Sequence, residues 1–167
     1  MRRYQLTNPR RNRNMLDSLT IEGASSKDLK SVVNLLELVN LPIEGVAESI
    51  NNFRVGKTIT DQMAIPPIVG CVGFEIYGEL GVLRSLAVHP DYQKRGVGRA
   101  LITDGLKFAR RNGMKTLYLL TDTARDYLVS LGFQETSRDT VPQKIRDTIE
   151  FSSLCPSTST CLSMSLE

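Results

Sequence analysis

Apolar residues recur at helical spacing in several parts of the chain. Behind Ser25 and Ser26, either of which can cap a helix, they fall every three or four positions until Pro42 stops the pattern. A later stripe of the same kind ends at Gly113. The helices predicted in this way cover residues 25–39, 45–52, 98–111, 123–131 and 143–147.

Runs rich in β-branched and apolar residues separate these helices. The predicted strands cover residues 53–58, 68–76, 81–88, 116–120 and 160–166. Tyr77-Gly78-Glu79-Leu80 lies between the second and third of them and predicts an antiparallel hairpin, whereas residues 60–67 are predicted to be a loop. Residues 116–120 are mostly apolar, which is typical of a strand buried on both faces, and the strand, helix, strand order before them implies a parallel crossover.

This order of elements predicts an α/β fold with a mixed central sheet and helices on both faces. The chain has 167 residues and 41% hydrophobic residues, which is the size of one domain with its own core. The net charge is +3, but five arginines precede the first acid, Asp17, so the remainder carries a net charge of −2. We predict a basic, disordered tail over residues 1–18 and a single domain over residues 19–167.

Charge and hydropathy also exclude some functions. A mildly acidic domain is not expected to bind nucleic acid, because such domains present a basic face. No run approaches the roughly 18 apolar residues of a membrane span, so a cytoplasmic protein without membrane contact is expected. Three cysteines without a C-x-x-C pair indicate reduced thiols and no metal site, although three thiols are what a trivalent soft metalloid would need.

The most informative stretch is Gln93-Lys94-Arg95-Gly96-Val97-Gly98, between a predicted strand and a predicted helix. Glycines at such a turn permit positive φ and a close approach of the backbone, so that successive N–H groups and the helix N-terminus point at an anion. A diphosphate fits this arrangement. The hexapeptide alone also occurs in ordinary strand-to-helix turns, so its context decides the interpretation.

The context is Leu86-Ala87-Val88-His89-Pro90 before the loop and Gly132-Phe133 after a later helix, and together these resemble the GNAT acetyltransferases. The resemblance spans about residues 19–166. It implies a mostly antiparallel sheet with one splayed parallel strand pair, and acetyl-CoA as cofactor, with its diphosphate on the loop and its pantetheine arm along the strand before it. The cofactor-binding residues implied are Leu86, Ala87, Val88, Gln93, Lys94, Arg95, Gly96, Val97, Gly98, Arg99 and Thr121.

Further residues resemble one branch of that family. Parts of the sequence are similar to the amino-acid N-acetyltransferases that include N-acetylglutamate synthases, and particularly to arsenic-resistance N-acetyltransferases. These parts are residues 119–121, 127–128, 132–133, Pro142 and residues 150–156. The resemblance implies a small-molecule amine substrate, an amino acid or an amino-acid-like toxicant. A catalytically silent acyl-CoA sensor and a protein N-acetyltransferase guided by the arginine tail are the alternatives, and a homodimer is left open.

The resemblance also directs the search for catalytic groups. Many GNAT enzymes protonate the leaving thiolate with a tyrosine four residues before Gly-Phe, but here that position holds Leu128, and Tyr127 lies about 100° around the helix. Tyr127 is therefore a candidate acid or a packing residue. The candidate bases are Glu75 and Glu79, which flank the predicted hairpin; His89, before a proline, is expected to be structural.

Arg84 and Ser85 interrupt the apolar pattern of a central strand. A buried arginine requires a partner, which leaves two interpretations. Either an internal carboxylate such as Glu75 pairs with Arg84, or the guanidinium faces the cleft and, with Ser85, binds the α-carboxylate of the substrate. Proximity of the two reactants supplies much of the rate in this chemistry, so a strong acid or base is not obligatory.

Overall fold

The described residues of the computed structural model, 15–59 and 67–167, form one sheet of seven strands in the order β1-β2-β3-β4-β5-β7-β6. The strands are β1 Leu19–Gly23, β2 Phe53–Thr58, β3 Ile68–Tyr77, β4 Leu80–Val88, β5 Thr116–Thr121, β6 Gln134–Glu135 and β7 Thr160–Ser165. The α-helices are α1 Leu29–Leu38, α2 Val46–Ser49, α3 Val97–Arg111, α4 Arg125–Ser130 and α5 Gln143–Arg146. Short 3-10 helices lie at Met15–Ser18, Ser26–Asp28, Ile50–Asn52, Pro90–Tyr92 and Arg138–Thr140, and a π-helix, η7, lies at Glu150–Leu154.

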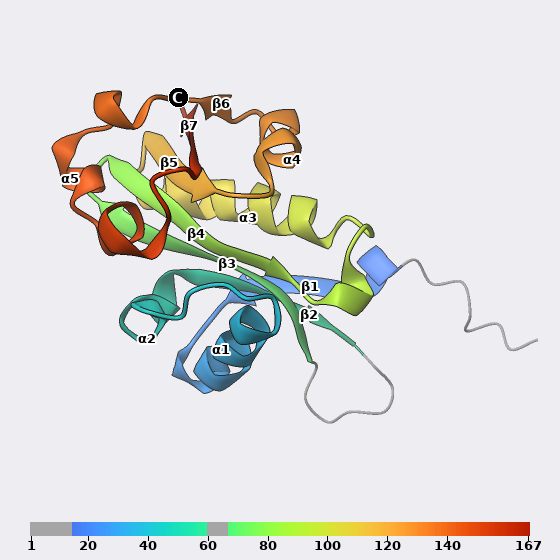
Figure 1. The fold of residues 1–167 in the computed structure, drawn as a ribbon. Helices are drawn as coiled ribbons and strands as arrows, with labels where there is room; N and C mark the ends of the chain where they lie inside the picture. Colours follow the sequence, from blue (N-terminus) through green and yellow to red (C-terminus); the bar gives the residue numbers. More distant parts are fainter. Residues whose placement is uncertain (1–14, 60–66) are drawn as a thin grey trace, which may run out of the picture.

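Helices cover both faces of the sheet (Figure 1). α3 packs on one face through a cluster that includes Leu83 and Leu117, and α1 and α2 pack on the other. Val82 and Tyr118, the alternate residues of β4 and β5, lie in a third cluster with residues of α5 and η7. Side chains of a strand alternate between faces, so α5 and η7 lie on the face opposite α3.

β4 and β5 are the parallel pair, and they separate early. Their ladder joins Leu80–Val82 to Thr116–Tyr118 and then ends, so the second half of β4 leaves its neighbour. A bulge lies just beyond this point: Gly73 pairs with Arg84 but Cys71 pairs with Ala87, and Ser85 takes a φ of 56°. A bulge bends its strand and redirects side chains, which is common beside active sites.

The predicted fold class is confirmed, including the mostly antiparallel sheet, the splayed parallel pair and the helices on both faces. The hairpin is also confirmed, with Tyr77 opposite Leu80. The prediction that residues 116–120 are buried on both faces is wrong, because Leu117 and Leu119 are buried but Tyr118 and Leu120 are only half-buried on the face that α5 and η7 cover.

Two short strands were not predicted, β1 and β6. β1 is an edge strand in which only Leu19 and Ile21 are partly buried, so its apolar signal is weak. Residues 15–18 of the predicted tail form a 3-10 turn before β1. Residues 1–14 of that tail, and most of the predicted loop at 60–67, lie outside the described residues. Within the described part of the chain, every helix is too short or too polar to cross a membrane.

Candidate active site between the splayed strands

The phosphate loop, residues 93–98, joins β4 to α3 and turns through two residues with positive φ. Lys94 has a φ of 59° and Gly96 a φ of 86°. The side-chain amide of Gln93 donates to the carbonyl oxygen of Val88 at 3.0 Å and holds the start of the loop against the end of β4. Residues 93–96 are exposed, so the loop presents its backbone to solvent.

α3 begins without a capping side chain among the residues that the structure describes. Its first helical hydrogen bond runs from the amide of Ala100 to the carbonyl of Gly96 at 3.0 Å. The amides of Val97, Gly98 and Arg99 therefore precede the helical ladder and point outward along the helix axis, where the dipole favours negative charge. The side chain of Val97 is buried in the core, so it can contribute only its amide. This arrangement fits a diphosphate, as the sequence predicted.

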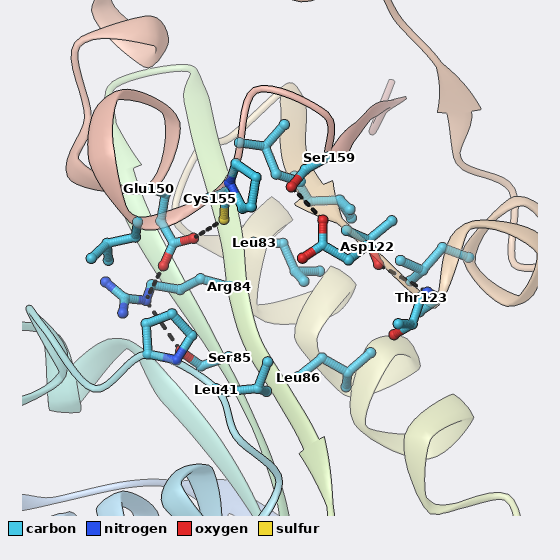
Figure 2. A pocket seen from close by; sticks show the side chains of 18 of the residues that line it. Leu41, Leu83, Arg84, Ser85, Leu86, Asp122, Thr123, Glu150, Cys155 and Ser159 are labelled. Carbon is cyan, nitrogen blue, oxygen red and sulfur yellow. Dashed lines mark hydrogen bonds and ion pairs between the residues drawn. The ribbon is translucent and has the colours of Figure 1, made fainter.

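A cavity of about 490 Å³ lies where β4 and β5 diverge (Figure 2). Its walls are residues 83–86 of β4, residues 119–124 at the end of β5, the α1–α2 connection at 39–42 and several residues of the segment 150–159, together with Leu128 of α4. The cavity thus borders the half of β4 that leads into the phosphate loop. Its size is that of a small-molecule site.

A fully buried arginine ties three of these walls together. Arg84 donates from Nη1 to Glu75 Oε1 at 2.8 Å and from Nη2 to the carbonyl oxygen of Glu44 at 2.6 Å. Its Nε donates to Ser85 Oγ at 3.1 Å and lies 3.1 Å from Glu150 Oε1. Of the two predicted interpretations, the internal pairing is therefore the one observed, and the hydroxyl of Ser85 serves the same arginine.

Glu150 is the site residue that sequence reasoning missed. It is 9% exposed, begins η7 and lines the cavity, and its Oε2 accepts a hydrogen bond from Cys155 Sγ at 3.4 Å. Burial raises the pKa of Glu150; the charge of Arg84 opposes this shift, and the net direction is upward. Burial and the neighbouring Glu150 raise the pKa of Cys155 to about 12, so its thiol stays protonated. The sequence held two signals for Glu150: it is an acid between Ile149 and Phe151, and it begins the segment 150–156 that resembles the amino-acid N-acetyltransferases.

The two predicted bases lie elsewhere. Glu79 is exposed in the hairpin turn and pairs with Lys115 at 2.7 Å, and it does not line the cavity. Glu75 is occupied by Arg84 and by the hydroxyl of Tyr77, which donates to it at 2.8 Å, and it lies behind the cavity wall. These positions speak against either carboxylate as the group that faces a substrate amine.

The predicted acid, Tyr127, lies outside the cavity, whereas Leu128 is buried and lines it. The tyrosine is 42% exposed, so it is not a core residue either. Its hydroxyl reaches the first turn of α3, where a Cβ added to Gly98 would meet it at 3.0 Å. Tyr127 therefore lies beside Gly98, at the end of the phosphate loop, on the side of α4.

This contact predicts a coupling between the two residues. Alanine at Gly98 gains up to about 1 kcal/mol of helix propensity over glycine, but its methyl group meets the Tyr127 hydroxyl at 3.0 Å, which offsets part of that gain. In a Tyr127→Phe background the oxygen is absent, so Gly98→Ala should be more favourable there than in the wild type by about 0.5 kcal/mol. Thermal unfolding of the four proteins measures this coupling; the same change in both backgrounds would show that the residues do not touch.

The other predicted residues have structural partners. Thr121 lines the cavity, but its Oγ1 accepts from the amide of Ala124 at 3.0 Å and so serves the turn before α4. Of the remaining cofactor candidates, Leu86 lines the cavity, and Ala87 is buried on the face that α1 covers. His89 Nδ1 accepts from the amide of Asp91 at 3.2 Å, in agreement with a structural role.

The cysteines are dispersed among different surroundings. Cys71 lies in the cluster under α1, Cys161 in the cluster under α5, and Cys155 at the cavity. The described ranges hold no group of three or more His, Cys, Asp or Glu residues that could bind a metal ion. The structure thus offers no combined thiol site for a metalloid within those ranges.

Residues 57–133 match the acetyltransferase (GNAT) family model, a segment that runs from β2 through the phosphate loop to Phe133. Residues 57–133 belong to a GNAT acetyltransferase domain. The GNAT domain is similar to the amino-acid acetyltransferase of Mannheimia succiniciproducens, 26% identical over 136 residues that cover 78% of this chain and 30% of the relative. It is also similar to that of Ectopseudomonas mendocina, 36% identical over 128 residues that cover 72% of this chain and 29% of the relative.

Solved structures share the fold of this GNAT domain. N-acetylglutamate synthase from Neisseria gonorrhoeae, complexed with coenzyme A and N-acetyl-glutamate, superposes with a TM-score of 0.73 at 23% identity, over 89% of this chain and 35% of that one. Rv2747 from Mycobacterium tuberculosis, in complex with CoA, gives a TM-score of 0.71 at 20% identity, over 89% and 99% of the two chains. The chain spans about a third of the length of the amino-acid acetyltransferases that it matches.

Proposed function

We propose that this protein is an acetyl-CoA-dependent N-acetyltransferase whose acceptor is the amine of a small molecule, an amino acid or an amino-acid-like toxicant of the arsenic-resistance type. The observation that carries the proposal is the cavity between β4 and β5, bordered by the strand that leads into the phosphate loop. Relatives named amino-acid acetyltransferases and neighbours solved with coenzyme A support it.

Each part of the site has a task in this reaction. Acetyl-CoA supplies an acetyl thioester, and the amides of Val97, Gly98 and Arg99 bind its diphosphate. The ladder with β5 ends at Val82, so the β4 backbone just beyond it has no strand partner on that side among the described residues and can align the pantetheine arm. Amides near Leu86 are proposed to polarise the thioester carbonyl. The cavity walls hold the amine beside it, which supplies much of the rate through proximity.

The test is a panel of amines incubated with the protein and acetyl-CoA, with free thiol measured over time. The panel contains the proteinogenic L-amino acids, an arsenic-bearing analogue of glutamate, simple alkylamines and peptides with free N-termini. Amine-dependent thiol release with a small amino acid or its analogue is expected. Turnover on peptides alone would contradict the proposed acceptor class.

A silent acyl-CoA sensor remains the second candidate because a leucine, Leu128, stands at the cavity where many GNAT enzymes have a tyrosine. The same experiment separates the two functions. Saturable binding of acetyl-CoA without thiol release on any amine would favour the sensor. The third candidate, a protein acetyltransferase guided by the arginine tail, requires that removal of residues 1–14 abolish activity.

A further inference from the structure

We propose that Glu150 is the general base that takes a proton from the ammonium form of the acceptor, an assignment that rests on the proposed function. Glu150 begins η7 and lines the cavity together with Arg84 and Cys155 (Figure 2). A π-helical turn is rare and occurs frequently at functional sites. Here the amide of Cys155 donates to the carbonyl of Glu150 at 3.2 Å, which closes the turn.

The carboxylate of Glu150 keeps acceptor capacity for a substrate. Its Oε1 lies in an ion pair with Arg84 Nε at 3.1 Å, but that N–H donates to Ser85 Oγ. From the described residues its Oε2 accepts one weak hydrogen bond, from the thiol of Cys155 at 3.4 Å. A carboxylate has about four lone-pair sites, so room remains for an N–H from the cavity.

Charge balance around Glu150 favours a cation. Among the described residues, Glu75 and Glu150 share one cation, Arg84, and the exposed Glu44 of the α1–α2 connection adds a third acidic group nearby. Cys155 remains a neutral thiol. The two carboxylates therefore exceed the charge of their one arginine, and an entering ammonium neutralises the excess negative charge. The raised pKa of Glu150 brings its basicity closer to that of an effective general base near neutral pH.

The step balances without a further reactant. One N–H bond of the ammonium breaks and an O–H bond forms on Glu150, which leaves a lone pair on nitrogen. That lone pair forms the C–N bond with the acetyl carbonyl carbon, and the C–S bond then breaks. A second proton leaves the nitrogen for the departing thiolate sulfur, and the proton on Glu150 passes to solvent.

Asp122 is the competing carboxylate at the cavity. It is exposed and accepts a hydrogen bond from the hydroxyl of Ser159, so water already solvates it. Glu75 and Glu79 do not line the cavity. Among the described residues, Glu150 is thus the buried carboxylate that faces the space where an acceptor amine would lie.

The test measures kcat/KM against pH with the most active amine of the panel. Glu150→Gln keeps the shape of the side chain and should lower kcat/KM by about 100-fold or more, with loss of the acidic limb that the Glu150 carboxyl produces in the wild-type profile. The affinity for coenzyme A should stay unchanged. Asp122→Asn, which removes the competing carboxylate at the cavity, should retain the acidic limb of the kcat/KM profile.

Two further variants should move the limb in opposite directions. The thiol of Cys155 lowers the pKa of Glu150 and the charge of Glu75 raises it. Cys155→Ala should therefore shift the acidic limb to higher pH, and Glu75→Gln should shift it to lower pH. A purely structural role for Glu150 predicts a fall in rate by the same factor at every pH and no opposed shifts.

The outcomes separate this assignment from the proposed function. If the wild-type protein acetylates no amine, the proposed function is wrong, and so is the assignment of Glu150 as the general base. If the wild-type protein is active but Glu150→Gln retains the rate and the acidic limb, the assignment alone is overturned. Should Glu150→Gln fail to fold, the opposed shifts of Cys155→Ala and Glu75→Gln still decide, because unmoved limbs in both variants overturn the assignment.

Discussion

Replacing Arg84 with methionine is expected to destabilise the domain by about 3–5 kcal/mol, because breaking a buried ion pair leaves charge without compensation. The side chain of Arg84 is fully buried, and it is the cation shared by Glu75 and Glu150. Methionine preserves most of the volume, so the loss reports the two stranded carboxylates and the freed carbonyl of Glu44. Denaturant unfolding measures the effect at neutral pH.

The sign of the pH dependence follows from Glu150. Burial already raises its pKa and Arg84 lowers it, so removal of Arg84 should raise the pKa further. A carboxyl with a pKa above its unfolded value makes the folded state bind more protons, and the folded state gains stability as pH falls. The deficit of Arg84→Met relative to wild type should therefore shrink from neutral to mildly acidic pH.

Arg125 provides the matched control. It also pairs with two carboxylates, those of Asp126 and Glu135, but all three side chains are largely exposed. Solvent screens such pairs, so Arg125→Met should change the unfolding midpoint little. Two results would contradict the claim that Arg84 balances the charge of Glu75 and Glu150. One is that Arg84→Met has the same free energy of unfolding as the wild type, and the other is that its loss of stability grows towards acidic pH.

The parts of the fold that sequence could predict are those encoded locally. The hairpin at Gly78, the turn at Gly96 and the helix stop at Gly113 depend on residues adjacent in the chain, and each lies where the pattern placed it. Helical periodicity also separated Leu128, which lines the cavity, from Tyr127, which does not. These signals need no knowledge of the tertiary fold.

The chemistry of the cavity could not be predicted in the same way, because it is assembled from distant segments. The guanidinium of Arg84 meets Glu44, Glu75 and Glu150 from three different elements, and no spacing in the sequence encodes their meeting. Ser85 at the bulge and Glu150 in the π-helical turn both contact Arg84. Sequence reasoning therefore found Arg84 and its partner Glu75, but the two carboxylates that it named as candidate bases, Glu75 and Glu79, do not line the cavity.

The second large effect is expected at Gly96. Valine there should weaken binding of coenzyme A by at least about 100-fold, equivalent to two lost charge-assisted hydrogen bonds of about 1.5 kcal/mol each. Gly96 has a φ of +86°, which a β-branched residue does not adopt. The loop must therefore change its conformation, and the N–H groups of Val97 and Gly98 no longer point at the diphosphate. Gly113, at the other end of α3, has a φ of +77° and open space around it.

Calorimetric titration of coenzyme A into the wild-type protein, Gly96→Val and Gly113→Val tests the central claim most directly. Both substitutions impose similar backbone strain, but only one lies where the diphosphate is proposed to bind. Saturable binding that is retained in Gly113→Val and lost in Gly96→Val is the predicted result. Absence of binding to the wild-type protein, or equal affinities in all three proteins, would contradict it.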